Sequence, residues 1–243
     1  MTSLFARLDP IAVLRRAGGG LDPDPVIAAP LAELAGAEGI SVSCGREADL
    51  VQERDLRLLR EVVRSALNVC APPAEEFVKL ALALRPDVVT LVPEAGEELR
   101  AARGLDVEDR RDELLPILQA LAAGGIGVAL LVDPSPAQVK AAHRLGAAAV
   151  LLHTGRLAWA GGPAARAAEF ETLVNAAKVA HRLGLSVHAG GGLSYPACRA
   201  VAQIPEIEAI HVGQSLVARA VLVGVEAAVR ELLRLLLGSE ARP

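Results

Sequence analysis

Aromatic side chains are nearly absent from this chain of 243 residues, at 2% of the total. Proteins that hold single-stranded nucleic acid stack its bases on such side chains. The formal net charge of −4 adds no attraction for a phosphate backbone. The composition therefore argues against nucleic acid as a partner.

Cysteine is scarce as well. The three cysteines, Cys44, Cys70 and Cys198, are too few and too scattered for a disulfide framework, which favours a reduced, cytoplasmic location. Long apolar runs are also missing: no stretch reaches the length of a membrane span, so we expect no membrane partner. Residues 1–20 lack the basic start and long apolar core of a signal peptide.

Short apolar runs that alternate with helical segments dominate the rest of the chain. They occupy residues 3–9, 39–44, 66–70, 87–92, 125–132, 148–153, 185–190 and 207–213. Such alternation is typical of βαβ units and a parallel sheet. The pattern predicts an α/β fold, a single-domain (β/α)8 TIM barrel over residues 1–243 that ends in one long helix at 215–237. An open doubly wound sheet is the alternative, but the G-x-G-x-x-G fingerprint after the first strand is missing.

Glycine is concentrated where two of the predicted strands end, in "HAGGG" (188–192) and "HVGQS" (211–215). The active sites of such barrels lie at the C-terminal ends of the strands, and the last two strands often build a phosphate site there. The backbone N–H groups of Gly192 and Gly213 and the helix start at Gln214 therefore predict phosphate binding. A tight loop that needs positive φ angles is the alternative.

Four residues are weaker candidates for catalysis. His188 and His211 occupy corresponding positions of neighbouring strands, as an acid–base pair or as two metal ligands with Cys70 as a third. No carboxylate-rich pattern accompanies them, so we favour two histidines in the barrel core that are hydrogen-bonded to each other or to Ser43, and we predict no metal site. As a nucleophile Cys70 needs a base or a positive neighbour, and a buried inert thiol is the alternative. Glu94 lies in a charged loop, which is either a lid or a solvated segment.

Several segments resemble the pyridoxine 5′-phosphate synthases of the deoxyxylulose-phosphate-dependent vitamin B6 route. They include "DPDPVIAAPLAELAGAEGISV", "RDLRLLRE", "HTG" (153–155), "AGGGLSY" and "GQSLVARAV", and they span the chain. The resemblance implies a cytoplasmic (β/α)8 barrel that forms a homo-oligomer, typically an octamer. It also implies the condensation of 3-amino-2-oxopropyl phosphate with 1-deoxy-D-xylulose 5-phosphate. We predict no cofactor.

The resemblance breaks at the positions that carry the family's chemistry. Of its N-x-D-H motif only Asp9 remains, with Arg7 in place of the asparagine, and Ser43 stands at the start of its H-x-R motif. Cys70 takes the place of a general-base glutamate, and Gly191 that of a proton-donor histidine. Further replacements are Gly18 for a loop arginine, Leu50 for a histidine, Arg100 for a lid threonine, Leu151 for a glutamate and Gln214 for a histidine.

Condensation, ring closure and dehydration need several proton transfers by groups tuned near neutral pH, and these replacements cannot supply them. We therefore expect a divergent family member that binds a phosphorylated small molecule without the condensation activity. Asp9, Arg7, Ser43 and Arg100 are expected to contact this ligand, in a barrel mouth made more cationic by the two arginines and two histidines. The alternatives are an active synthase rebuilt from the four catalytic candidates, and a non-catalytic partner of an intact synthase.

Overall fold

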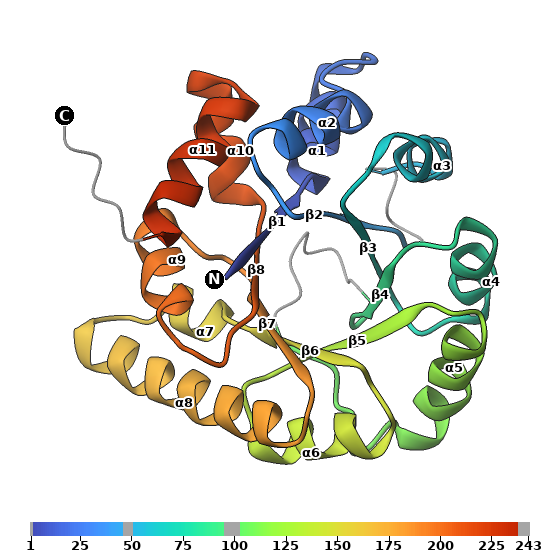
Figure 1. The fold of residues 1–243 in the computed structure, drawn as a ribbon, viewed down its shortest axis with the longest axis vertical. Helices are drawn as coiled ribbons and strands as arrows, with labels where there is room; N and C mark the ends of the chain where they lie inside the picture. The colour runs from blue at the N-terminus through green and yellow to red at the C-terminus, as the bar shows by residue number, and fades with distance from the viewer. Residues whose placement is uncertain (1, 46–50, 95–102, 238–243) are drawn as a thin grey trace.

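The strands form a closed parallel barrel in chain order (Figure 1). The computed structural model describes residues 2–45, 51–94 and 103–237. The strands are β1 (Ser3–Arg7), β2 (Gly39–Ser43), β3 (Ala66–Ala71), β4 (Val88–Leu91), β5 (Gly127–Val132), β6 (Ala149–His153), β7 (Ser186–Gly190) and β8 (Ala209–Val212). Pairing of β8 with β1 closes the sheet and confirms the predicted single-domain (β/α)8 barrel.

Helices surround the barrel on its outside (Figure 1). They are α1 (Asp9–Gly18), α2 (Pro25–Leu34), α3 (Glu53–Val62), α4 (Glu75–Leu84), α5 (Arg111–Ala123), α6 (Pro136–Arg144), α7 (Gly155–Ala158), α8 (Pro163–Arg182), α9 (Tyr195–Ala202), α10 (Gln214–Val223) and α11 (Val225–Leu236). None of the helices in the described ranges is both long and apolar enough to cross a membrane.

The apolar runs form strands because both faces of a parallel barrel are covered. Leu4, Ala6, Ile40 and Val42, for example, are completely buried in the core between strands and helices. Local signals divide the chain into elements. The side chain of Asp24 caps α2 by accepting a hydrogen bond from the N–H of Val26 at 2.8 Å.

Glycines with positive φ angles end several helices, as the repeated helix–glycine–strand order predicts. Gly146 and Gly184, which follow α6 and α8, both have φ angles of 79°. The predicted single helix at 215–237 is wrong, because Gly224, with a φ angle of 85°, separates α10 from α11. Apolar periodicity continues on both sides of Gly224, so the pattern alone hides the break.

Polar side chains fill part of the barrel interior. Asn68 donates a hydrogen bond to Ser41 Oγ at 2.9 Å, and Thr90 donates one to Asn68 Oδ1 at 2.7 Å. All three residues are buried. This layer lies just below the C-terminal end of the barrel, where the candidate site is found.

Candidate functional site

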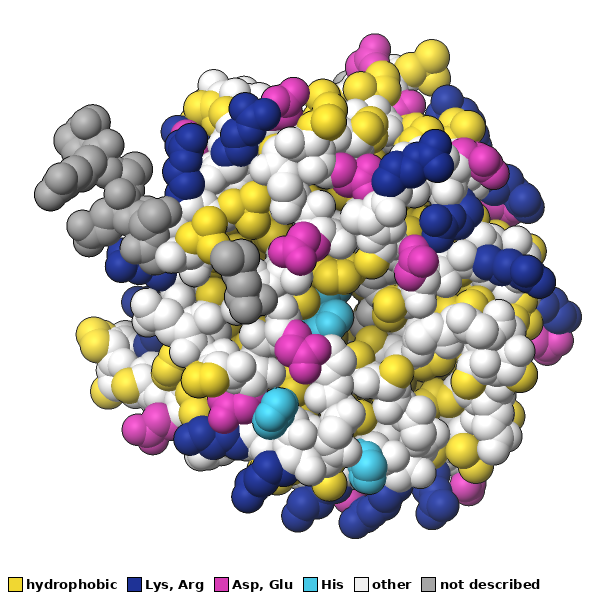
Figure 2. All heavy atoms as spheres, in the orientation of Figure 1, with side chains coloured by type: hydrophobic (Ala, Val, Ile, Leu, Met, Phe, Trp, Pro, Cys, Tyr) yellow, Lys and Arg dark blue, Asp and Glu magenta, His cyan; other side chains and the backbone are white. Residues whose placement is uncertain are grey.

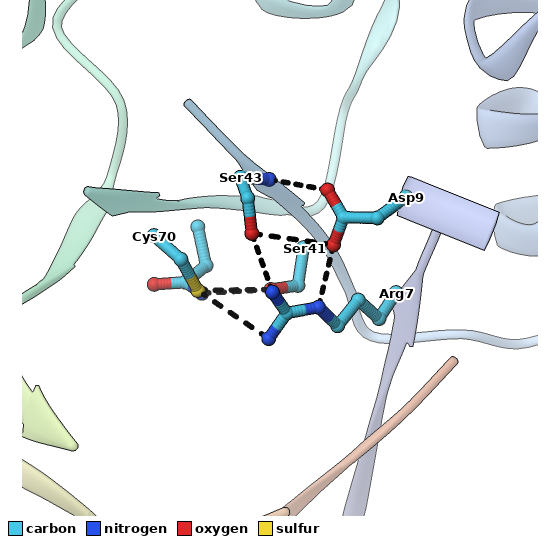
Figure 3. A network of polar contacts seen from close by, with 6 residues as sticks. Arg7, Asp9, Ser41, Ser43 and Cys70 are labelled. Carbon is cyan, nitrogen blue, oxygen red and sulfur yellow. Dashed lines mark hydrogen bonds and ion pairs between the residues drawn. The ribbon is translucent and has the colours of Figure 1, made fainter. Parts of the chain in front are cut away.

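Arg7 is the centre of a polar network at the C-terminal end of the barrel (Figure 3). Its Nε donates to Asp9 Oδ2 at 2.5 Å, its Nη2 donates to Ser43 Oγ, and its Nη1 lies 3.9 Å from Cys70 Sγ. The backbone N–H of Ser43 donates to the other oxygen of Asp9 at 2.6 Å. The network joins β1, β2, β3 and the start of α1, so three of the predicted ligand contacts, Arg7, Asp9 and Ser43, lie together.

The network fixes a positive charge at the barrel mouth. Burial lowers the pKa of Arg7, but the charges of Asp9 and Cys70 and the hydrogen bond to Asp9 together raise the pKa above its ordinary value. The Arg7 side chain keeps 34% of its surface exposed. Asp9 is only 14% exposed, so its carboxylate is largely occupied by Arg7 and Ser43.

Cys70 lies beneath this network and is completely buried. Its sulfur is 3.5 Å from Asn68 Nδ2 and 3.7 Å from Ser41 Oγ, besides its contact with Arg7. The positive neighbour that a nucleophilic thiol requires is therefore present. The solvent access that it also requires is not.

The glycine run and the start of α10 lie side by side. Ser215, in the first turn of α10, donates from Oγ to the carbonyl oxygen of Leu193 at 2.6 Å. The first backbone hydrogen bond of α10 runs from the N–H of Val217 to Gly213 O at 2.9 Å. The N–H groups that precede Val217 in this helix, beginning with Gln214, are therefore available to solvent or to an anion.

Each glycine of the predicted phosphate site is packed closely against another residue. A Cβ atom at Gly192, whose φ angle is 73°, would lie 3.1 Å from Ala158 Cβ and 3.1 Å from a ring carbon of Trp159. At Gly213, with ordinary φ, it would lie 3.1 Å from the Cβ of Arg7. Gly213 thereby brings the start of α10 close to the Arg7 network.

His153 and Asp133 form a pair at the same end of the barrel that sequence reasoning did not connect. His153 Nδ1 lies 3.8 Å from Asp133 Oδ1, and His153 is only 4% exposed. Thr154 donates from Oγ1 to Gly191 O at 2.7 Å, which ties the end of β6 to the glycine run. Asp133 follows β5 without any motif around it, so the position of the strand end was the only available signal.

The two catalytic candidates His188 and His211 come together inside the barrel. His188 Nδ1 lies 3.1 Å from His211 Nε2, so of the two arrangements that the sequence leaves open, the histidines are hydrogen-bonded to each other. Burial lowers the pKa of both rings; the neighbouring His188 and Arg7 lower that of His211 further. The expectation that they add positive charge to the mouth therefore does not hold.

The remaining candidates lie apart from this pair. Glu94 is exposed, and its negative charge helps to raise the pKa of Arg110. Arg100 and Leu50 lie outside the described residues. Within the described ranges, no cluster of three or more His, Cys, Asp or Glu side chains is arranged to hold a metal ion.

A family profile described as "Pyridoxal phosphate biosynthesis protein PdxJ" matches residues 4–238. The chain belongs to this family. A pyridoxine 5′-phosphate synthase from Synechococcus sp. is 47% identical over 232 residues, which cover 96% of this chain and 97% of that relative. Another from Cyanothece sp. is 44% identical over 239 residues, covering 98% of this chain and all of the relative.

Two solved structures with the same fold are more distant in sequence than these relatives. A thiamine phosphate pyrophosphorylase from Pyrococcus furiosus superposes with a TM-score of 0.62 at 20% identity, covering 98% of this chain and 97% of the other. A phosphoribosyl anthranilate isomerase from Thermus thermophilus superposes with a TM-score of 0.61 at 16% identity, covering 98% and 99%. At these identities the likeness establishes the barrel fold alone.

Two positions at which the sequence resemblance leads us to expect replaced family residues are closely packed in the structure. Cys70, which the resemblance aligns with a general-base glutamate, is buried and packed against Arg7. Gly191, aligned with a proton-donor histidine, has a φ angle of 111° and lies against the ring of His153. Both positions are thus built into the packing of the mouth.

Proposed function

We propose that this chain binds a phosphorylated small molecule at the C-terminal end of the barrel and does not carry out the condensation for which its family relatives are named. The Arg7 network carries this proposal. Arg7 forms an ion pair with Asp9, whose carboxylate is retained from the family motif. The positively charged side chain of Arg7 is partly exposed and lies beside the start of α10. Such a mouth favours the binding of an anion.

Three features converge on a phosphate group. The guanidinium of Arg7 supplies a permanent charge suited to phosphate oxygens. The first turn of α10 supplies backbone N–H donors and the positive end of the helix dipole. The glycine run is tied to that turn by the hydrogen bond from Ser215 to Leu193, which supports a shared role for Gly192, Gly213 and Gln214.

Loss of acid–base groups supports the absence of condensation. A general base must reach the proton that it removes, and the family's base position is here the buried Cys70. The family's proton donor is replaced by Gly191, where a Cβ atom would lie only 2.9 Å from the ring of His153. Neither position retains a group that can exchange a proton with a substrate.

An active synthase is the second candidate function, and one observation favours it. The imidazole of His153 and the carboxylate of Asp133 lie 3.8 Å apart at the end of the barrel where such enzymes carry their active sites. The high identity to relatives named as synthases points the same way. On this alternative the reaction would use the His153–Asp133 pair in place of the four candidates from the sequence.

We also propose that the protein forms a homo-oligomer. Large apolar side chains are exposed on the neighbouring helices α1, α2 and α10. They are Leu14, Ile27, Leu34, Val221 and Leu222. Clustered exposed apolar groups are typical of interfaces, and sedimentation of the purified protein will test this. A sedimentation coefficient of a monomer would contradict the proposal, and an intact synthase that co-sediments with it would favour a non-catalytic partner role.

The decisive experiment separates binding from turnover. Calorimetry with 1-deoxy-D-xylulose 5-phosphate measures binding, and mass spectrometry after incubation with both family substrates detects pyridoxine 5′-phosphate. An intact family member serves as the positive control. We expect binding without product, and formation of product would overturn the proposal.

A pair of glycine substitutions tests the position of the site. Gly213→Asp places a bulky negative side chain at the start of α10 and should abolish phosphate-ester binding. Gly184→Asp adds the same charge after α8, where a Cβ atom meets nothing within 4 Å, and should leave binding intact. Equal affinities in the two variants would place the ligand elsewhere.

A further inference from the structure

The histidine pair belongs to a longer row of hydrogen bonds that the proposed function does not use. Ser186 Oγ donates to Glu208 Oε2 at 2.5 Å and lies 3.2 Å from His188 Nε2. His188 Nδ1 in turn lies 3.1 Å from His211 Nε2. Four side chains from β7, β8 and the residue before β8 are therefore joined without a gap.

One end of the row meets solvent at the N-terminal end of the barrel. Glu208 precedes β8, is exposed, and lines an open cavity of about 420 Å³ together with Thr2, Pro205 and Leu237. In the view of Figure 2, a histidine side chain is visible at the centre of the barrel, with acidic side chains close to it. Water therefore reaches the carboxylate end of the row.

The other end is a buried nitrogen directed away from the row. Nδ1 of His211 has no hydrogen-bond partner among the described residues, and His211 is 5% exposed. Its ring stacks on Phe5 with centroids 4.6 Å apart and an interplanar angle of 12°, which fixes its orientation. His211 precedes Gly213 by two residues on the strand that leads into the candidate phosphate site.

An ionised Glu208 sets the direction of every hydrogen bond in the row. Because a carboxylate only accepts, Ser186 donates to Glu208 and must accept from the Nε2–H of His188. A neutral His188 then has a bare Nδ1, which accepts the Nε2–H of His211. A neutral His211 is left with a bare Nδ1, which is a buried base below the candidate site.

We propose that Glu208, Ser186, His188 and His211 form a proton relay that connects the candidate site with solvent at the opposite end of the barrel. A proton from a ligand or water in the site binds Nδ1 of His211, whose Nε2 proton moves to Nδ1 of His188. The Nε2 proton of His188 then moves to Ser186, and the hydroxyl proton of Ser186 moves to Glu208. One N–H or O–H bond forms for each that breaks, and Glu208 releases the proton to water.

The electrostatic surroundings keep both rings neutral, as this transfer requires. Burial lowers the pKa of His188 and outweighs the charge of Glu208, which raises it. Burial lowers the pKa of His211, and the positive charge of Arg7 on β1 adds to this effect. The other neighbours, Phe5 on β1 and Leu151 on β6, carry no charge.

The test uses protein labelled with ¹⁵N in its histidine rings, whose NMR spectra report tautomer and protonation directly. His188→Asn and His211→Asn assign the two rings. In the wild-type protein we expect both rings neutral with the proton on Nε2 over about pH 6 to 8. Ser186→Ala removes the acceptor that fixes His188 and should produce a mixture of tautomers.

The rate at which the ring protons exchange with water is the second readout. If the row were purely structural, it would not transfer protons and this rate would not depend on it. Ser186→Ala should slow the exchange of the His211 Nε2 proton by at least about tenfold, the effect of removing one hydrogen bond from the path. Glu208→Gln keeps an acceptor for Ser186 but cannot hold the proton, so it should slow exchange while retaining the Nε2 tautomers.

A matched control lies at the same end of the barrel. Ser3 donates from Oγ to Glu38 at 2.8 Å, as Ser186 does to Glu208, but no histidine continues that pair. Ser3→Ala should change neither tautomers nor exchange. Protons on Nδ1 in the wild-type protein, or exchange that is unchanged in Glu208→Gln, would overturn the relay even if Ser186→Ala failed to fold.

Discussion

Gly191 lies directly against His153. A Cβ atom at position 191 would come within 2.9 Å of His153 Cδ2 and 3.0 Å of Nε2, and the φ angle of Gly191 is 111°. Two independent constraints therefore keep this position free of a side chain. The ring of His153 could not stay in place beside one, and few residues other than glycine adopt this backbone conformation.

The first prediction compares two glycine-to-alanine substitutions. Gly191→Ala should lower the free energy of unfolding by about 1–3 kcal/mol, because it adds a contact with His153 to a strained φ angle. Gly146→Ala, at a φ angle of 79° with nothing within 4 Å of the new Cβ, measures the backbone contribution alone. Equal losses in urea denaturation of the two variants would show that His153 moves aside without penalty.

The second prediction concerns crystals grown with sulfate or phosphate. An anion should lie against the backbone N–H groups near Gly192 and Gly213, within reach of the Arg7 guanidinium. These groups are brought together by the close packing of Gly213 on Arg7 and by the Ser215–Leu193 hydrogen bond. An anion bound elsewhere at the mouth, with this position empty, would contradict the proposed site.

The sequence predicts the barrel well because its signals are local. Strands buried on both faces read as apolar runs, and glycines mark the ends of helices. The break at Gly224 is missed because apolar residues continue on both sides of it, and a glycine inside a helix costs only about 1 kcal/mol. Only the observed φ angle of 85° shows that the helix ends there.

The site is predicted less completely, since its contacts depend on how separate strand ends meet. The sequence brings His188 and His211 together correctly, although the strand register pairs His188 with Ala209. The two histidines are two register positions apart on neighbouring strands, and their rings still lie within hydrogen-bond distance. The approach of His153 to Asp133 depends on the path of the chain after β5, for which the sequence has no motif. Likewise, a glycine in the sequence shows that space is tight but not which residue fills it.

The third prediction concerns a buried ion pair between α1 and α3. Arg15 donates from Nη1 and Nη2 to the two oxygens of Asp55 at 3.1 and 2.5 Å, and Asp55 is completely buried. Burial raises the pKa of Asp55, but hydrogen bonds from Arg15 and from the backbone of Gln52 lower it below its ordinary value overall. The pair therefore stabilises the fold above the pKa of the unfolded carboxyl, about 3.9, and this contribution is lost as the pH falls through the folded value.

Asp55→Asn should consequently lower the free energy of unfolding at neutral pH by about 3–5 kcal/mol, the range for breaking a buried pair. Below pH 3 the difference between variant and wild type should shrink. Glu75→Gln breaks an exposed pair with Lys79 on one helix and should leave the urea midpoint unchanged. A difference between Asp55→Asn and wild type that does not depend on pH would mean that packing, and not charge, is responsible.

The last prediction concerns the pH dependence of stability that the histidine pair causes, at a less acidic pH than that of Asp55. The pKa of His211 lies well below its ordinary value because the ring is buried and faces His188 and Arg7. Below about pH 6.5 the unfolded chain therefore binds a proton that the folded protein does not. As the pH decreases further, the free energy of unfolding decreases by up to about 1.4 kcal/mol per pH unit, until the pH reaches the pKa of His211 in the folded protein. His211→Asn removes this group and should flatten that part of the stability profile.

His143→Asn, the same change at an exposed position in the last turn of α6, should retain the wild-type slope. Urea denaturation of the three proteins between about pH 5 and 8 measures these slopes. If His211→Asn kept the full slope, the buried ring would be taking up its proton in the folded protein, and the neutral pair that the geometry supports would be wrong.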